Sequence, residues 1–238
     1  MSEKTHLVLL PGFLCDRTVW EHQIEALSDL ADCTVPDWGT LDSLTAMAEA
    51  VLHAAPERFA LAGHSMGGRV AMQLYRLAPH RVERIALMNT GAIARDPGPG
   101  GQNEERERRA LLALARAQGM RAMAVEWLKG MLPPYRQTHL ELVESILRMF
   151  ERKSPDMFEI QMEALLARPD AVPVLSQIDC PALVLTGCDD VWSPPARHQE
   201  MAAAIPASQL VLVPRCGHMS TMERPAEVAQ AMRAWLDG

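Results

Sequence analysis

Short runs of apolar residues alternate with longer amphipathic stretches in the first part of the chain. The apolar runs predict strands near residues 7–10, 33–35, 59–62 and 85–88. Between these runs, apolar residues recur at helical spacing near residues 19–27, 44–54 and 70–77. Short strands that alternate with helices are typical of β-α units that build a parallel sheet. We therefore expect the chain to begin as an α/β core.

The alternation stops at the turn-rich segment Asp-Pro-Gly-Pro-Gly-Gly of residues 96–101, and no strand-like run follows until about residue 182. Apolar spacing instead predicts helices near residues 104–117, 120–128, 140–150 and 157–166. The α/β pattern resumes with strands near 182–186 and 210–213 and helices near 196–205 and 227–236. We therefore expect a core of residues 1–91 and 171–238, with residues 92–170 inserted as a helical layer.

Composition and charge narrow the class of protein. The chain has 238 residues, of which 48% are hydrophobic and 22% charged, as in ordinary soluble globular proteins. Its net charge of −7 and the absence of a basic run argue against nucleic-acid binding. No stretch reaches the roughly 18 apolar residues of a membrane span, and residues 7–10 are too short a run for a signal-peptide core. We expect a cytoplasmic protein with no membrane partner, and the oligomeric state stays unknown.

The cysteines are odd in number, and none forms a Cys-x-x-Cys pair: Cys15, Cys33, Cys180, Cys188 and Cys216. This usage is typical of reduced thiols in a cytosolic compartment. We expect no structural disulfide, and we expect Cys188 and Cys216 to be buried and inert.

One glycine-rich segment falls between a predicted strand and a predicted helix. Gly63-His64-Ser65-Met66-Gly67 fits the pattern G-x-S-x-G in the strand–turn–helix context that a nucleophilic serine requires. The serine of such a turn sits on a sharp bend, where side chains two residues away would collide with the neighbouring strand and helix. Ser65 is therefore a candidate nucleophile.

A nucleophilic serine needs a base and a group that orients the base. Asp189 and Asp190 follow the predicted strand at 182–186, and His218 follows the predicted strand at 210–213. The carboxyl ends of parallel strands are where open α/β sheets place their functional sites. The order serine, acid, histidine is therefore present, with two aspartates as rivals for the acid.

These segments resemble the α/β-hydrolase superfamily. The resemblance is carried by residues 63–68, by Gly187 to Pro194 with aspartate at the fourth place, and by Gly217-His218 followed by Glu223-Arg224-Pro225. It spans the chain outside the helical insert, and it is greatest to small carboxylesterases of the pimeloyl-acyl-carrier-protein methyl ester esterase and 3-oxoadipate enol-lactonase type.

The resemblance implies an α/β-hydrolase fold: a mostly parallel central sheet, helices on both faces and a small inserted helical cap. It implies Ser65 as nucleophile, His218 as general base and acid, and Asp190 as the orienting carboxylate, since the family's spacing favours Asp190 over Asp189. It also implies an oxyanion hole formed by the backbone amides of Met66 and Phe13.

The inserted helices carry several methionines, together with Trp127 and Phe150, that could line an adaptable apolar pocket. For any one of these residues, packing of a helix onto the core is the more common role. The charged run Glu104 to Arg109 is most simply a solvated helix face.

The expected function is a serine hydrolase that cleaves a small, largely apolar carboxylic ester through an acyl-enzyme. Its partner would be a small-molecule ester. The sequence contains no His-Glu-x-x-His, no zinc-type Cys/His spacing, no G-x-G-x-x-G and no Walker pattern, so we expect no metal and no cofactor.

Two alternatives remain open. Ser-Met-Gly-Gly-Arg, residues 65–69, resembles a menaquinone-pathway synthase, in which a similar triad serves carbon–carbon cleavage or elimination. That reaction predicts cations around the site for an anionic substrate, whereas we expect Arg69 to point away from the site. The second alternative is a ligand receptor that keeps the triad and turns over slowly.

Overall fold

A six-stranded parallel sheet forms the centre of the computed structural model, which describes residues 4–238. The strand order is β2-β1-β3-β4-β5-β6. The strands are β1 (Thr5–Leu10), β2 (Ala31–Thr34), β3 (Phe59–His64), β4 (Val82–Met88), β5 (Ala182–Gly187) and β6 (Ser208–Val213). The predicted α/β fold with its parallel sheet is confirmed.

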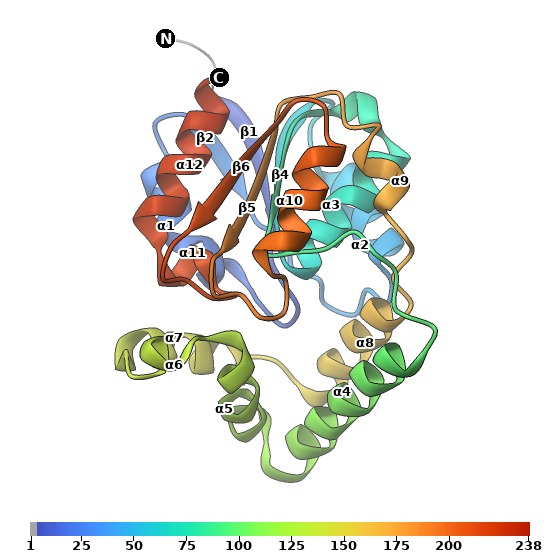
Figure 1. Ribbon diagram of the computed structural model, residues 1–238, viewed down its shortest axis with the longest axis vertical. Helices are drawn as coiled ribbons and strands as arrows, with labels where there is room; N and C mark the ends of the chain where they lie inside the picture. The colour runs from blue at the N-terminus through green and yellow to red at the C-terminus, as the bar shows by residue number, and fades with distance from the viewer. Residues whose placement is uncertain (1–3) are drawn as a thin grey trace.

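Helices cover both faces of the sheet (Figure 1). On one face, α1 (Glu21–Ala26) packs against α12 (Pro225–Asp237), and on the other α2 (Leu44–Ala54) packs against α3 (Met66–Leu77). The helix α10 (Pro195–Ala204) contacts β5 and β6. The inner strands β3 and β5 are therefore buried along their whole length, which explains their unbroken apolar runs in the sequence.

The strand register brings the carboxyl ends of the strands to one edge of the sheet. Leu10 of β1 is level with Gly63 of β3, and Gly63 is level with Leu87 of β4. Gly187, the last residue of β5, is level with Val213, the last residue of β6. The loops that follow these strands therefore emerge side by side.

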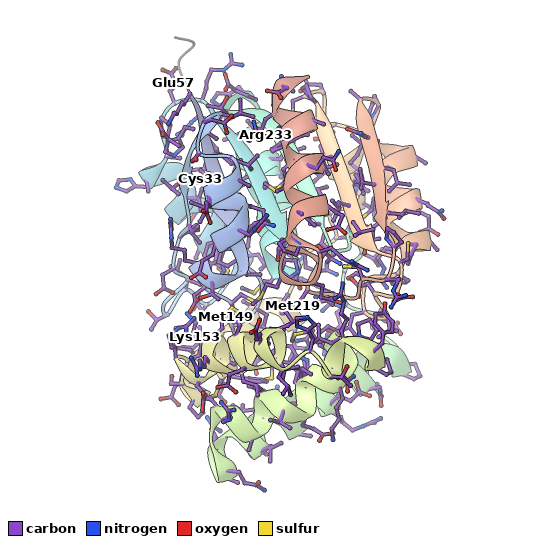
Figure 2. All side chains as sticks on the ribbon, turned by 90° about the vertical axis from the view of Figure 1, so that its left-hand side faces the viewer. Cys33, Glu57, Met149, Lys153, Met219 and Arg233 are labelled. Atoms are coloured by element: carbon purple, nitrogen blue, oxygen red, sulfur yellow. The ribbon has the colours of Figure 1, made fainter. Side chains whose placement is uncertain are left out.

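The segment between β4 and β5 forms a helical layer beyond this edge (Figure 1). Figure 2 places Met149 of the layer and Met219, which follows β6, at the boundary between the two parts. The layer comprises α4 (Pro99–Gln118), α5 (Met120–Met131), α6 (Pro134–Gln137), α7 (Leu140–Glu151) and α8 (Pro155–Leu166).

Five short helical segments were not separate elements in the sequence pattern. They are α6, α9 (Val172–Leu175), α11 (Ser220–Glu223) and the 3-10 helices Arg17–Trp20 and Pro79–Arg81. Segments of three or four residues are too short to show helical periodicity. Their placement was therefore beyond what hydrophobic spacing could indicate.

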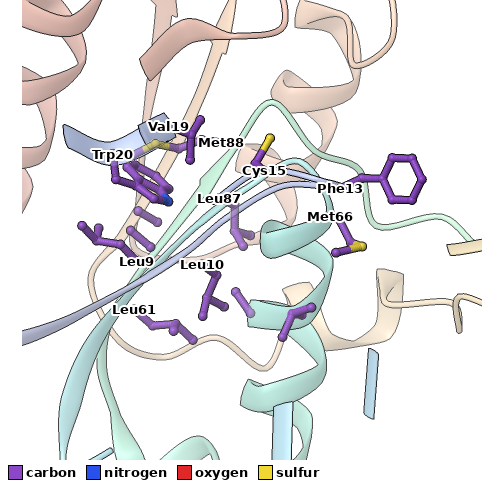
Figure 3. Close-up of a cluster of buried hydrophobic side chains, with 14 of the residues drawn as sticks. Leu9, Leu10, Phe13, Cys15, Val19, Trp20, Leu61, Met66, Leu87 and Met88 are labelled. Atoms are coloured by element: carbon purple, nitrogen blue, oxygen red, sulfur yellow. The ribbon is translucent and has the colours of Figure 1, made fainter. Parts of the chain in front are cut away.

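The core of the sheet consists of fully buried aliphatic side chains. Figure 3 shows Leu9 and Leu10 of β1 with Leu61 of β3 and Leu87 of β4 in this cluster, near the start of α3. Among residues 4–238, no helix is both long enough and apolar enough to cross a lipid bilayer.

All five cysteines lie in the described part of the chain and are free thiols. Cys216 is buried as expected. Burial is the largest cause that raises the pKa of its thiol. The expectation for Cys188 is wrong, because this thiol is exposed at the start of the loop after β5.

Candidate active site

Ser65 occupies a sharp turn between β3 and α3. Its φ angle of 55° lies in the left-handed region, which residues other than glycine seldom adopt. A Cβ atom at Gly63 would lie 2.3 Å from Gly67 O, and one at Gly67 would lie 2.2 Å from Leu10 O. Only glycine fits at both positions, so the glycines of the sequence pattern are what allow this turn to form.

The structure brings Ser65, His218 and Asp190 together. His218 Nε2 lies 2.9 Å from Ser65 Oγ, and His218 Nδ1 lies 2.9 Å from Asp190 Oδ2. The three side chains come from the ends of β3, β6 and β5, which the parallel register aligns. The serine hydroxyl is hydrogen-bonded to an imidazole, and a carboxylate orients that imidazole. Such an arrangement can generate a nucleophile.

Asp190 is held as a carboxylate by its surroundings. Its Oδ1 accepts hydrogen bonds from the amides of Trp192 and Ser193, at 3.0 and 2.9 Å. Its Oδ2 accepts one from Asn89 Nδ2 at 3.0 Å. Burial acts to raise the pKa of Asp190, but the charge of His218 and these hydrogen bonds outweigh it, so the pKa is lowered.

The rival aspartate lies elsewhere. Asp189 is exposed, and its carboxylate accepts a hydrogen bond from the hydroxyl of Tyr135, which belongs to α6. Of the two candidates, Asp190 is therefore the one that contacts His218.

Two residues to which the sequence analysis gave no role support this arrangement. Asn89, directly after β4, donates to Asp190 and to Gly217 O, and Glu223 accepts hydrogen bonds from the amides of Gly217 and Met219 on either side of His218. The position of Asn89 at a strand's carboxyl end was a usable signal. Nothing in the sequence pattern showed that Glu223 turns back onto the histidine loop.

Two buried histidines are held neutral near the site. His64 Nε2 donates to His218 O at 2.8 Å, and His198 Nε2 accepts from the amide of Thr90 at 3.1 Å. The pKa of both histidines is lowered from 6.5 to about 4, and burial is the largest cause. Protonation would leave a new buried N–H of His64 without an acceptor and would remove the acceptor of the Thr90 amide.

These histidines predict that the protein loses stability in mild acid. Between pH 6.5 and about 4 the unfolded chain binds protons that the folded chain does not, so stability is greatest above pH 6.5 and falls below it. We expect the free energy of unfolding to fall by about 2 kcal/mol per histidine between about pH 7 and pH 5. Urea unfolding at several pH values measures this fall.

The matched controls for this prediction are His198→Gln and His53→Gln. The first should remove about half of the fall in stability, because His64 still contributes its share. The second changes an exposed histidine and should leave the pH dependence as in the wild type. A wild-type stability that is constant across this pH range would contradict the prediction.

Phe13 and Met66 lie at the same cavity as Ser65. Met66 is the first residue of α3, so its amide has no acceptor within the helix. Figure 3 shows Phe13 in the loop after β1 and Met66 at the start of α3, on the two segments that flank the turn. Both residues therefore lie on segments that border the nucleophile, and the role of their amides as an oxyanion hole stays a prediction.

The cavity has a volume of about 450 Å³ and is lined by both the sheet edge and the helical layer. Trp127, Met131 and Phe150 supply apolar lining, whereas Met123, Met149 and Met162 are buried in packing. The edge of Trp192 lies against His218, with ring centroids 4.9 Å apart.

The expectation of a largely apolar cavity is only partly right. Arg69, expected to point away from the site, lines it. So do Glu104, Glu107 and Arg108 of the run expected as a solvated face. Residues on a helix face cannot be assigned to water or to a cavity until the neighbouring layer is known.

Comparisons with known proteins agree with the fold. The chain is 28% identical over 240 residues to a pimeloyl-[acyl-carrier protein] methyl ester esterase of Nitrosomonas europaea, with 96% of this chain and 94% of the relative covered. The structure superposes on a thermophilic esterase of Thermogutta terrifontis with a TM-score of 0.86 at 30% identity, covering 100% of this chain and 91% of the other.

An enol-lactonase of Burkholderia xenovorans LB400 also has a TM-score of 0.86, at 24% identity, with 100% of this chain and 93% of the other covered, and shows the same fold. The family model described as alpha/beta hydrolase matches residues 7–231, which include both the serine turn and the histidine loop. Sheet topology, the turn at Ser65 and this match together show that the chain belongs to the alpha/beta hydrolase family.

Proposed function

We propose that the protein is a serine hydrolase that cleaves carboxylic esters through an acyl-enzyme on Ser65. The observation that carries the proposal is the chain of two 2.9 Å contacts from Ser65 Oγ through His218 to Asp190. The names of the relatives, an esterase in sequence and an esterase in structure, support an ester as the substrate.

In the acylation step, Ser65 Oγ attacks the ester carbonyl carbon while its proton passes to His218 Nε2. The carbonyl oxygen becomes an oxyanion, which accepts hydrogen bonds from the amides of Phe13 and Met66. The bond to the alcohol oxygen then breaks, and His218 gives its proton to the departing alcohol. The buried carboxylate of Asp190 stabilises the imidazolium in between.

In the deacylation step, water attacks the acyl carbon and its proton passes to His218 Nε2. The bond to Ser65 Oγ breaks, the carboxylic acid leaves, and Ser65 regains its proton from His218. In this assignment residues 92–170 are a cap on a core of residues 1–91 and 171–238. The cap contributes Trp127, Met131 and Phe150, which would contact the apolar part of the substrate.

One observation favours a second candidate function. Carbon–carbon cleavage or elimination on an anionic substrate needs cations at the site, and Arg69 lines the cavity that contains Ser65. The ester reaction predicts an acyl group on Ser65 and release of an alcohol, whereas elimination gives neither.

The test is hydrolysis of p-nitrophenyl esters from acetate to octanoate, followed by mass spectrometry of acid-quenched protein. We expect release of p-nitrophenol and an acyl group on the peptide that contains Ser65. A folded wild-type protein that hydrolyses none of the esters and carries no acyl group would contradict the proposal.

The contacts of Glu223 predict that it positions His218. Glu223→Ala leaves the amides of Gly217 and Met219 buried without acceptors, which costs about 1 to 3 kcal/mol for each. We expect kcat for the best ester to fall by about tenfold to a hundredfold, because the histidine loop is no longer fixed. Steady-state kinetics and urea unfolding measure the two effects.

Glu223→Gln retains one carbonyl acceptor and should recover part of kcat. The control Glu227→Ala removes an exposed carboxylate from the neighbouring helix turn and should change neither kcat nor stability appreciably. A kcat of Glu223→Ala equal to that of the wild type would show that Glu223 does not position the histidine.

A further inference from the structure

The wall of the active-site cavity carries more cations than anions. Its charged residues give an excess of two positive charges, although the whole chain has a net charge of −7. They are Arg69, Arg108, Arg168, Arg197, Glu104 and Glu107. A positive wall inside an acidic protein favours an anionic ligand.

Two of the four arginines share one carboxylate, that of Glu104. Glu104 accepts hydrogen bonds from Arg108 Nε at 3.1 Å and from Arg168 Nη1 and Nη2 at 2.9 and 2.7 Å. These three side chains form one network along α4 and the end of α8. Arg108 and Arg168 are therefore engaged in ion pairs with Glu104 within the helical layer.

The other two arginines bond only to backbone carbonyl groups. Arg69 Nη1 donates to Ile93 O at 3.0 Å, and Arg197 Nη1 donates to Trp192 O at 3.0 Å. Among residues 4–238, neither guanidinium group forms an ion pair with a carboxylate. Each therefore retains N–H donors that can bind a further acceptor.

These two guanidinium groups are neighbours. A Cβ atom added at Gly91 would lie 3.3 Å from Arg197 Nη1 and 3.4 Å from Arg69 Nη2, so both groups border the same residue. Arg69 is one helical turn from Ser65, and Arg197 is in the first turn of α10. The two guanidinium groups, neither of which has a carboxylate partner among residues 4–238, thus lie near each other at one side of the cavity that contains Ser65.

The surroundings of Arg69 are unfavourable for its charge. Burial, followed by the positive charges of Arg168 and Arg197, lowers its pKa to about 9. A buried cation that lacks a partner is costly, and an anion bound beside it removes that cost.

We propose that the substrate carries a free carboxylate in addition to its scissile ester, and that Arg69 and Arg197 bind this carboxylate. The inference rests on the proposed esterase function and names the class of ester. Guanidinium groups match the planar geometry of a carboxylate and bind it through paired N–H donors. Trp127, Met131 and Phe150 then contact the chain between the two functional groups or the part beyond the ester.

The test compares matched pairs of esters that differ in one carboxylate. Monomethyl adipate and dimethyl adipate place the charge on the acyl side, and γ-acetoxybutyrate and its methyl ester place it on the alcohol side. We expect kcat/KM in at least one pair to be about tenfold or more higher for the carboxylate, since a charge-assisted hydrogen bond is gained. Titration of released acid measures the total initial rates, and chromatography of the products identifies which ester bond is cleaved.

Variants assign the preference to the two arginines. Arg69→Gln and Arg197→Gln should each lower the ratio of kcat/KM between the charged and neutral esters by about tenfold. Arg148→Gln removes an exposed arginine of α7 and should leave this ratio at the wild-type value. Circular dichroism checks that each variant folds, and either arginine variant alone is sufficient to test the assignment.

The outcomes separate this inference from the proposed function. Ser65-dependent hydrolysis with no preference for the carboxylate in either pair would overturn the inference and leave the esterase assignment intact. If no ester is hydrolysed, the esterase assignment fails. In that case the binding of adipate tests whether Arg69 and Arg197 form a carboxylate site. A rise in melting temperature with adipate that Arg69→Gln abolishes would support the carboxylate site, and no rise in the wild type would overturn it.

Discussion

Ser65→Ala is expected to lower kcat/KM for every ester that the wild type hydrolyses by about a thousandfold or more. The reason is that Ser65 Oγ, 2.9 Å from His218 Nε2, is the atom that forms the acyl bond in the proposed mechanism. Alanine removes only this oxygen, so the cavity, the oxyanion amides and the histidine stay in place. Release of p-nitrophenol by equal amounts of the two proteins measures the loss.

The control is Ser176→Ala, which removes a hydroxyl from an exposed site distant in sequence from the turn. Its kcat/KM should equal that of the wild type. Alanine at position 65 must adopt the same φ of 55°, so circular dichroism and a melting curve should accompany the rates. A folded Ser65→Ala protein that retains its rate would remove Ser65 as the nucleophile.

Hydrophobic spacing was sufficient to predict the core because its inner strands are buried on both faces. The apolar runs near residues 59–62 and 182–186 lie within β3 and β5, and the structure extends both runs by one or two residues towards the site. Ser65 and His218 could also be identified, because each lies in the short loop or turn that follows such a run. The local sequence determines where each parallel strand ends. Functional sites of open α/β sheets form at the carboxyl ends of these strands.

The interior of the cavity could not be predicted in the same way. Arg69 lies on a helix that the sequence identified, but whether it meets solvent or the cavity depends on the helical layer beyond the sheet edge. Arg197 and Gly91 are distant in sequence, and only the fold places them in contact. Charged residues have no periodic pattern that marks a cavity wall, so the charges that line this cavity became evident only from the structure.

Asp190→Asn is expected to lower kcat by about a thousandfold to ten-thousandfold. An asparagine amide can donate to His218 Nδ1, which would move the imidazole proton to Nε2, so that the histidine could no longer accept the proton of Ser65. With its NH2 group in the place of Oδ2, the asparagine would also oppose the donor Asn89 Nδ2, whereas its carbonyl oxygen could still accept from Trp192 N and Ser193 N. Steady-state kinetics with the best p-nitrophenyl ester measures the loss.

Asp189→Asn is the matched control, because it makes the same chemical change one residue away. Asp189 is exposed and accepts a hydrogen bond only from the hydroxyl of Tyr135, among residues 4–238. An asparagine carbonyl can still accept that bond, so kcat should fall by less than about fivefold. If Asp189→Asn were the more damaging of the two changes, Asp189 would be the acid that orients His218, and the 2.9 Å contact of Asp190 with His218 would not be the one that matters for catalysis.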